Sequence, residues 1–257
     1  MKDWEEIADW YNEKQGDTGD LWHRALIDPV LLRVVGTSRG KEILDLGCGN
    51  GYLSRKLARS GAKVTAVDSS QRMIRNARAH DPNGSLGISY VCCDARRMAV
   101  IPSSKFDLVF GNMSLMDIGD AEGAVKEVSR VLRSGGRFVA SISHPCFDVM
   151  SNSRWIAEKR MGSPPVVYRQ VTGYRKSFSE KVPWNSSQNR KSYTESYHRP
   201  LNWYARVFRN CGMAITKLEE PAPTREFIEE EQKEQGDFDG VGFLEVPLHL
   251  VIEAVKL

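Results

Sequence analysis

Cysteine, long apolar runs and an excess of charge of one sign are all scarce in this sequence. The five cysteines, Cys48, Cys92, Cys93, Cys146 and Cys211, are odd in number and include no Cys-x-x-Cys pair. This pattern argues against a zinc ribbon, an iron–sulfur cluster and a disulfide scaffold. No apolar run approaches the roughly 18 residues that a membrane-spanning helix needs, so no membrane partner is expected.

The charge balance and the N-terminus exclude other classes. A net charge of +3 over 257 residues is small, so electrostatics alone does not indicate a nucleic-acid or membrane surface. Residues 1–6 are charged and lack the apolar core of a signal peptide. We therefore expect a cytoplasmic protein. With 41% hydrophobic and 27% charged residues, the composition is that of a globular protein. A length of 257 residues is ordinary for one α/β domain with an insertion.

The most informative segment is residues 42–51, with the sequence Glu-Ile-Leu-Asp-Leu-Gly-Cys-Gly-Asn-Gly. It predicts a buried strand that breaks into a glycine-rich turn and opens a helix. Gly47, Gly49 and Gly51 remove side chains where the backbone must turn sharply and a ligand must come close. The N–H groups at the helix start, together with the helix dipole, suit an anionic ligand group.

Three acidic residues follow or end three successive predicted strands. Asp68 closes strand 63–67, some twenty residues after the first glycine, and can accept hydrogen bonds from ribose hydroxyls. Asp94 follows strand 88–93 and can accept from an adenine amino group. Asp45 precedes the first glycine by two residues, where it could meet a positively charged methionine end. The glycine turn with Asp68 alone also fits a nicotinamide cofactor, but the Gly-x-Gly-x-Gly spacing and the two other acids favour S-adenosylmethionine.

On these residues the sequence resembles the class I S-adenosylmethionine-dependent methyltransferases, of the type that acts on small molecules. The matching segments are 44–51, 67–68, 94–95, 106–112 and 131–138. The resemblance implies an α/β, Rossmann-like, doubly wound sheet of seven strands whose last strand is antiparallel. It also implies S-adenosyl-L-methionine as cofactor and S-adenosyl-L-homocysteine as product, and it does not extend to the acceptor.

The chain is expected to form a single methyltransferase domain, residues 1–257, in four parts. Residues 1–38 read as an N-terminal helical arm, 40–145 as the cofactor-binding core, 146–197 as an insertion and 198–257 as the C-terminal part of the sheet. Strands and helices alternate through the core, which favours a parallel doubly wound sheet. A long insertion in a compact domain is usually functional. We interpret it as a lid with a β-hairpin over the acceptor site, with a structural or dimer-forming flap as the alternative.

Candidate ligand-binding residues come from the strand ends, the arm and the lid. Those expected at the cofactor are Asp45, Gly47, Cys48, Gly49, Asn50, Asp68, Ser69, Met73, Asp94, Ala95, Asn112 and Met113. Those expected at the acceptor are Tyr11, Trp22, His23, Phe147, Trp184 and Tyr197. Plain packing is the alternative for the aromatic residues of the arm and for Met73.

Methyl transfer from a sulfonium is an in-line displacement, which needs a base only if the nucleophile carries a proton. His144, at the carboxyl end of the predicted strand 137–143, is the first candidate base, and capping the strand end is its alternative role. His198, at a predicted helix start, is the second candidate, and His23 is the third.

The residues after segment 106–112, the fourth predicted strand of the core, restrict the type of methyltransferase further. Asn112 is followed by Met-Ser-Leu and not by the Pro-Pro-aromatic sequence of methylases that act on exocyclic amines. The same place lacks the aspartate cluster of magnesium-dependent methylases, so no metal is expected. The leading hypothesis is transfer to an oxygen or nitrogen of a small organic acceptor by a monomer or homodimer.

Two other readings stay open besides a nicotinamide oxidoreductase. Nine basic residues between 154 and 191 interleave with aromatic residues, as in a nucleic-acid surface. An RNA methyltransferase is therefore one alternative, although nucleic acid is not the expected partner. A non-catalytic cofactor-binding subunit is the other.

Overall fold

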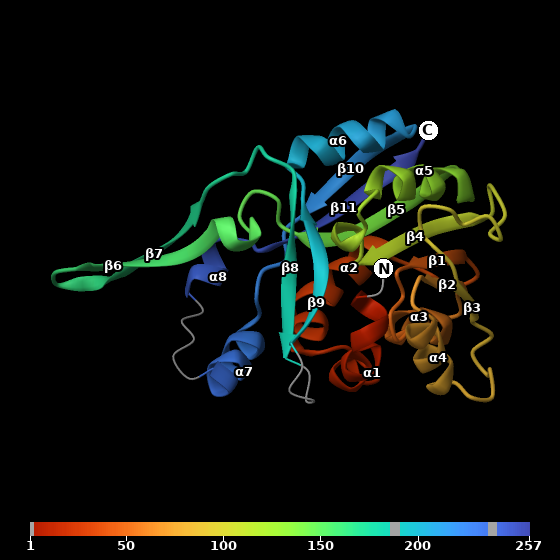
Figure 1. Ribbon diagram of the computed structural model, residues 1–257, viewed down its shortest axis with the longest axis horizontal. Helices are drawn as coiled ribbons and strands as arrows, with labels where there is room; N and C mark the ends of the chain where they lie inside the picture. The colour runs from red at the N-terminus through yellow and green to blue at the C-terminus, as the bar shows by residue number, and fades with distance from the viewer. Residues whose placement is uncertain (1–2, 186–190, 236–240) are drawn as a thin grey trace.

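The computed structural model describes residues 3–185, 191–235 and 241–257 (Figure 1). Seven strands form the central sheet: β1 (Glu42–Leu46), β2 (Lys63–Asp68), β3 (Ser89–Cys92), β4 (Phe106–Asn112), β5 (Leu132–Ser143), β10 (Met213–Glu219) and β11 (His249–Lys256). Their order across the sheet is β10-β11-β5-β4-β1-β2-β3.

The pairing of these strands confirms the predicted α/β architecture. β1 pairs in parallel with β2 and β4, and the pairs β2–β3 and β4–β5 are parallel as well. β11, the last strand, runs antiparallel to both β5 and β10. Because parallel strands end at the same edge of a sheet, the carboxyl ends of β1 to β5 lie together.

Helices surround the sheet (Figure 1). They are α1 (Asp3–Gln15), α2 (Asp28–Val35), α3 (Tyr52–Arg59), α4 (Gln71–Ala79), α5 (Ala121–Val131), α6 (Leu201–Asn210), α7 (Arg225–Gln235) and α8 (Val241–Glu245). Three short helical segments are η1 (His23–Ile27), η2 (Leu115–Asp117) and η3 (Met150–Asn152).

The N-terminal helical arm contains a π-helical turn, η1, directly before α2. The Asp28 N–H bonds to the His23 carbonyl, five residues back. Pro29 at the start of α2 has no N–H to continue the regular ladder. This missing donor explains why the backbone widens here.

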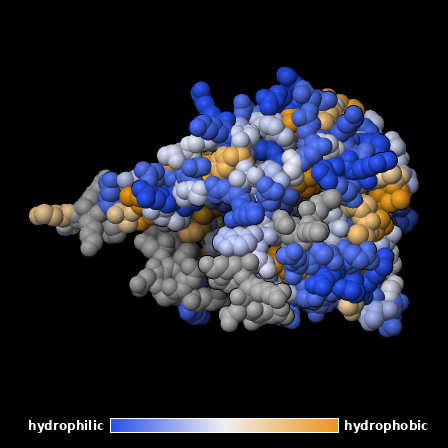
Figure 2. Space-filling model, viewed as in Figure 1, coloured by the Kyte–Doolittle hydropathy of each residue, from blue (hydrophilic) through white to orange (hydrophobic). Residues whose placement is uncertain are grey.

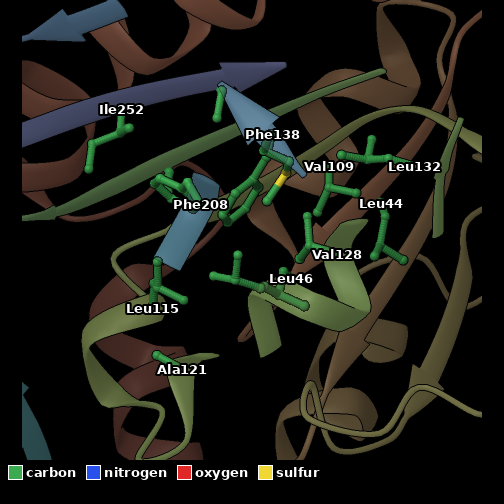
Figure 3. Packing of buried hydrophobic residues seen from close by; sticks show 14 of the residues in the cluster. Leu44, Leu46, Val109, Leu115, Ala121, Val128, Leu132, Phe138, Phe208 and Ile252 are labelled. Atoms are coloured by element: carbon green, nitrogen blue, oxygen red, sulfur yellow. The ribbon is translucent and has the colours of Figure 1, made fainter. Parts of the chain in front are cut away.

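The core lies on both faces of the sheet. Leu44 and Leu46 of β1 point into a cluster with Phe138 and Phe208, whose ring centroids are 5.7 Å apart (Figure 3). Ile43 points into the cluster on the opposite face, as the alternation of a strand requires. Since both faces of β1 are covered, its three apolar residues, Ile43, Leu44 and Leu46, are all fully buried.

The insertion forms two β-hairpins, where the sequence predicted one. The first consists of β6 (Ser153–Arg160) and β7 (Ser163–Val171), and the second of β8 (Phe178–Asn185) and β9 (Lys191–His198). The β6–β7 hairpin extends away from the body of the molecule, whereas β8–β9 crosses beside α1 (Figure 1). Of the basic residues noted in the sequence, Arg190 lies outside the described residues.

Hydrophilic residues cover most of the face shown in Figure 2. Among the helices that the structure describes, none has the length and apolar character to cross a membrane. All five cysteines are free thiols.

Candidate functional site

The glycine turn after β1 packs so closely that it admits no side chain at Gly47. This residue has a φ of +73°, and a Cβ placed on it would lie 2.6 Å from the Ser114 Cβ. The N–H groups of Gly47 and Cys48 both donate to the Val67 carbonyl, at 2.9 and 3.0 Å. Gly49, with a φ of +53°, is more open, since its Cβ would meet only the Tyr11 ring at 3.7 Å. The turn is therefore fixed at Gly47 and open to the neighbouring cavity at Gly49.

Asp68 joins the end of β2 to this turn. Its carboxylate accepts hydrogen bonds from the backbone N–H of Gly49 (3.0 Å) and of Ser70 (2.9 Å). Burial raises the pKa of Asp68, and the hydrogen bonds from Ser70 and Gly49 oppose that rise. The carboxylate also lines a cavity at the carboxyl edge of the sheet.

The other two strand-end acids lie in different surroundings. Asp94 accepts from the backbone N–H of Arg96 (2.9 Å) and from its guanidinium (2.6 Å), and these bonds hold the pKa of Asp94 below its usual value. Asp45 is only 2% exposed and accepts from the Ser54 hydroxyl at 2.6 Å. Burial raises the pKa of Asp45 to about 7.

Two cavities bring together all the residues predicted to bind the cofactor. The larger has a volume of about 340 Å³, and nine of these residues line it: Gly47, Gly49, Asp68, Ser69, Met73, Asp94, Ala95, Asn112 and Met113. The smaller has a volume of about 30 Å³. It is lined by the remaining three, Asp45, Cys48 and Asn50, and shares Gly47, Gly49 and Asn112 with the larger one.

A hydrogen-bond network holds the end of β4 between the two cavities. The Asn112 amide nitrogen donates to the Tyr52 hydroxyl (2.9 Å) and to the Asp28 carboxylate (3.1 Å). Ser141 in turn donates to the Asn112 oxygen at 2.5 Å. With donor and acceptor sides both engaged, the Asn112 side chain has one defined orientation.

Three of the six predicted acceptor residues line these cavities. Tyr11 borders both, Tyr197 borders the larger and His23 borders the smaller. The His23 Nδ1 lies 2.7 Å from the Asp20 carboxylate, which orients the imidazole ring.

The other three predicted acceptor residues do not line either cavity. Trp22 packs on Phe227, with ring centroids 5.0 Å apart, and Phe147 packs on His144 at 4.7 Å. For Trp22 and Phe147 the observed contacts are those of plain packing.

Trp184 lies behind the cavity lining, where it joins α1 to β8. Its ring centroid is 5.8 Å from those of Trp4 and Trp10, and 6.4 Å from that of Tyr11. Trp4 and Tyr11 themselves line the larger cavity. Trp184 therefore supports the cavity wall through these two rings.

Of the three histidines predicted as candidate bases, His23 lines the smaller cavity, whereas His144 and His198 line neither. The Cys146 N–H donates to the His144 Nδ1 (3.1 Å), and the His144 Nε2 lies 3.0 Å from the Glu220 carboxylate. Because Nδ1 is an acceptor here, Nε2 carries the proton and the ring has no free lone pair. Burial lowers the pKa of His144. The geometry is that of a strand-end cap, so a catalytic role for His144 stays a prediction without geometric support.

His198 is similarly engaged. Its Nε2 lies 2.8 Å from the Tyr174 carbonyl, its ring packs on Phe178 at 5.2 Å, and the residue is 4% exposed. A catalytic role for His198 likewise stays a prediction.

Sequence reasoning missed several residues of the larger cavity, of which Asp117 is the most notable. The others are Trp4, Val67, Cys93, Arg96, Ser114, Ile118, Gly119 and Glu195. Burial raises the pKa of Asp117 to about 7, although a hydrogen bond with Ser196 and the charge of Arg199 lower it. Its place five residues after Asn112, at the carboxyl edge of the sheet, is the signal that could have identified it.

No group of three or more His, Cys, Asp or Glu side chains in the described part of the chain is placed to hold a metal ion.

Comparison with known proteins agrees with the fold. Residues 44–140 match the family model described as a methyltransferase domain. Over 136 residues, the chain is 33% identical to the ubiquinone biosynthesis O-methyltransferase of Coxiella burnetii, covering 52% of this chain and 56% of that protein. Its counterpart in Xanthomonas oryzae is 31% identical over 118 residues, 45% of this chain and 49% of that protein. The chain thus spans about half the length of the curated relatives it matches.

A solved structure matches over more of the chain. It is an S-adenosylmethionine-dependent methyltransferase from Mesorhizobium loti, with a TM-score of 0.70 and 24% sequence identity. The match covers 94% of this chain and 100% of that one. At this identity the likeness establishes the fold.

Proposed function

Since residues 44–140 form a methyltransferase domain of the class I S-adenosylmethionine-dependent family, we propose that this chain transfers the methyl group of S-adenosylmethionine to an oxygen or nitrogen of a small organic acceptor. The observation that carries the proposal is one cavity lined by the three elements such a transfer requires. These are strand-end acids, an open glycine turn and aromatic side chains.

The residues present fit this cofactor. The Asp68 carboxylate lines the cavity, and beyond its bonds to Gly49 and Ser70 it keeps lone pairs that can accept from ribose hydroxyls. Asp94 lines the same cavity, where its carboxylate would meet an adenine amino group, and Arg96 donates to both of its oxygens. The open space at Gly49 lets a ligand approach the backbone.

When bound, the cofactor supplies a methyl group on a positively charged sulfur. The chain must place the acceptor behind that methyl group and keep water away. Trp4 and Tyr11 of α1 and Tyr197 of β9 line the cavity on the side of the arm and the second hairpin. These rings can both enclose an acceptor and exclude water.

The size and character of the cavity favour a small acceptor. A volume of about 340 Å³ is within the range of pockets for small molecules. The curated relatives are named as O-methyltransferases of ubiquinone biosynthesis, which supports oxygen as the acceptor atom.

The test is transfer of radiolabelled methyl groups to a metabolite extract. Purified protein should place the label in small molecules, and Asp68→Ala should lose most of that transfer because it binds the cofactor less well. Label found only in RNA or in protein would contradict the proposal. An RNA acceptor would also show binding that falls steeply with salt concentration.

A further inference from the structure

The wall of the larger cavity has two parts of different origin. One part comes from the ends of β1, β2 and β3 and carries the acids assigned to the cofactor. The other part comes from α1, from the segment after β4 and from β9. Asp117 belongs to this second part, together with Ile118 and the aromatic rings of Tyr11 and Tyr197. Asp117 and Glu195 of β9 are the two acids on the side left for the acceptor, and Asp117 is the less exposed of the two.

The surroundings of Asp117 hold it in place without neutralising it by a direct ion pair. Ser196 of β9 hydrogen-bonds to its carboxylate. Arg199 is the nearby cation, but its guanidinium donates to the carbonyls of Ile118 (2.6 Å) and Gly119 (2.8 Å), the residues that follow Asp117. Arg199 thus fixes the loop that carries Asp117.

The other titratable groups that act on Asp117 come from two more elements. They are Tyr11 of α1 and Tyr204 of α6, and burial raises the pKa of both phenols. Both are therefore neutral near pH 7. Glu195 of β9 is exposed and lines the same cavity.

We propose that the carboxylate of Asp117 is the catalytic base, and that the acceptor is a phenol or an enol whose hydroxyl proton it takes. The inference rests on the proposed function and specifies its substrate class. The acceptor oxygen forms a bond to the methyl carbon, and the carbon–sulfur bond breaks with its electron pair going to sulfur. The hydroxyl proton passes to an Asp117 oxygen and leaves to water after the product departs.

The acidity of Asp117 restricts the acceptor. Its pKa is about 7. Proton transfer to it from a phenol, whose pKa is about 10, is therefore unfavourable by a factor of about 10³. An aliphatic alcohol, with a pKa close to the 15.7 of water, would face an equilibrium of about 10⁹. A neutral hydroxyl also avoids a second cation beside the sulfonium, which an ammonium acceptor would bring.

The aromatic side chains of the cavity wall also favour a phenol or an enol as the acceptor. The rings of Trp4, Tyr11 and Tyr197 line the part of the cavity that contains Asp117. Flat aromatic molecules pack well against such rings.

The experiment compares wild type with Asp117→Asn on two acceptors of different acidity, phenol and 4-nitrophenol, at about pH 8.5. Phenol needs a base, so the variant should lose about 10²- to 10⁴-fold in kcat/KM. 4-Nitrophenol is already ionised at this pH, so the loss should be at most a few-fold. With phenol, the wild-type kcat/KM should rise as the pH passes about 7, because Asp117 loses its proton there.

Two results would overturn the inference. Equal losses on both acceptors would make Asp117 a positioning residue. No transfer from wild type to any phenol, with amines methylated instead, would exclude the substrate class. Label in small amines would overturn this inference and leave the proposed function intact. Label only in RNA or protein would overturn both the inference and the proposed function.

A second readout does not depend on turnover. In protein labelled with ¹³C at the aspartate carboxyl carbons, one resonance that titrates near pH 7 should disappear in Asp117→Asn. Ser196→Ala should move that midpoint upward, because the Ser196 hydrogen bond stabilises the ionised form. A midpoint near pH 4 for Asp117 would contradict the role.

Discussion

The two parts of the cavity wall are built in different ways. The cofactor part comes from short strand-to-turn segments, such as residues 42–51, in which neighbouring residues hold one another. The acceptor part joins α1, η2 and β9, which lie far apart in the sequence. The cofactor part is set by local backbone geometry and the acceptor part by long-range packing, so substitutions should affect the two differently.

Gly47→Ala should have the largest effect. A side chain there combines a left-handed φ with a clash against Ser114, which together should lower the free energy of unfolding by about 3 kcal/mol. Cofactor affinity should fall as well. The matched control is Gly212→Ala, which has the same φ of +73° but nothing within 4 Å of the added Cβ. It should cost about 1 kcal/mol and leave cofactor binding unchanged.

Urea denaturation and calorimetry with S-adenosylhomocysteine measure these two effects. Equal losses of stability in the two glycine variants would mean that the contact with Ser114 relaxes without cost.

Asp68→Ala should weaken cofactor binding by about 1–3 kcal/mol, because the ribose loses a charged acceptor and the Gly49 N–H loses its partner. Asp81→Ala is the matched control. Asp81 also accepts from two backbone N–H groups, those of Ser85 and Leu86, but lies outside the cavity. Calorimetry should show unchanged affinity for Asp81→Ala. Unchanged affinity for Asp68→Ala would remove Asp68 from the site.

Asp45 should make the stability of the ligand-free protein depend on pH. Its folded pKa of about 7 lies above the ordinary value of 3.8, so the folded state keeps a proton that the unfolded state loses between these values. Stability should therefore fall as the pH rises from 5 to 7, by about 2 kcal/mol relative to Asp45→Asn. Urea unfolding from pH 5 to pH 8 measures this difference.

Asp94→Asn provides the comparison for Asp45. Because Arg96 holds the pKa of Asp94 below its usual value, Asp94 is ionised in both states above pH 5. The stability of wild type relative to Asp94→Asn should therefore be constant over this range. A flat difference for Asp45→Asn as well would show that water reaches Asp45.

Trp184→Ala should have the smallest effect and should act on the acceptor part alone. Without this ring, Trp4 and Tyr11 lose a packing partner, so the KM for the acceptor should rise by about tenfold, or about 1.4 kcal/mol. Cofactor affinity should be unchanged. Trp155→Ala, in the β6–β7 hairpin, is the control and should alter neither quantity. An equal rise of KM in Trp184→Ala and Trp155→Ala would mean that both hairpins support the acceptor part of the cavity.

The strand-end acids could be predicted because each needs only its own strand and turn to be placed. All the residues predicted at the cofactor line one of the two cavities. The acceptor side was harder to predict. His144 directly follows β5 as expected, yet its ring contacts Glu220 and Cys146. No pattern within residues 137–147 determines that choice.

The place of Asp117 in the cavity wall could not be predicted from the sequence either. In the sequence it is one acid in the mostly apolar segment 113–119 after β4, and only the approach of β9 places it beside Ser196. Trp184 likewise lies behind the cavity wall because α1 packs against the second hairpin.

The sequence by itself determined the sheet, the glycine turn and the cofactor, because these depend on alternation, φ angles and charges carried within a few residues. The tertiary structure alone decided which further acid and which rings line the larger cavity beside the strand ends. That outcome depends on contacts between segments more than 60 residues apart, such as α1 and β9, and burial by such contacts changes both the exposure and the acidity of a side chain.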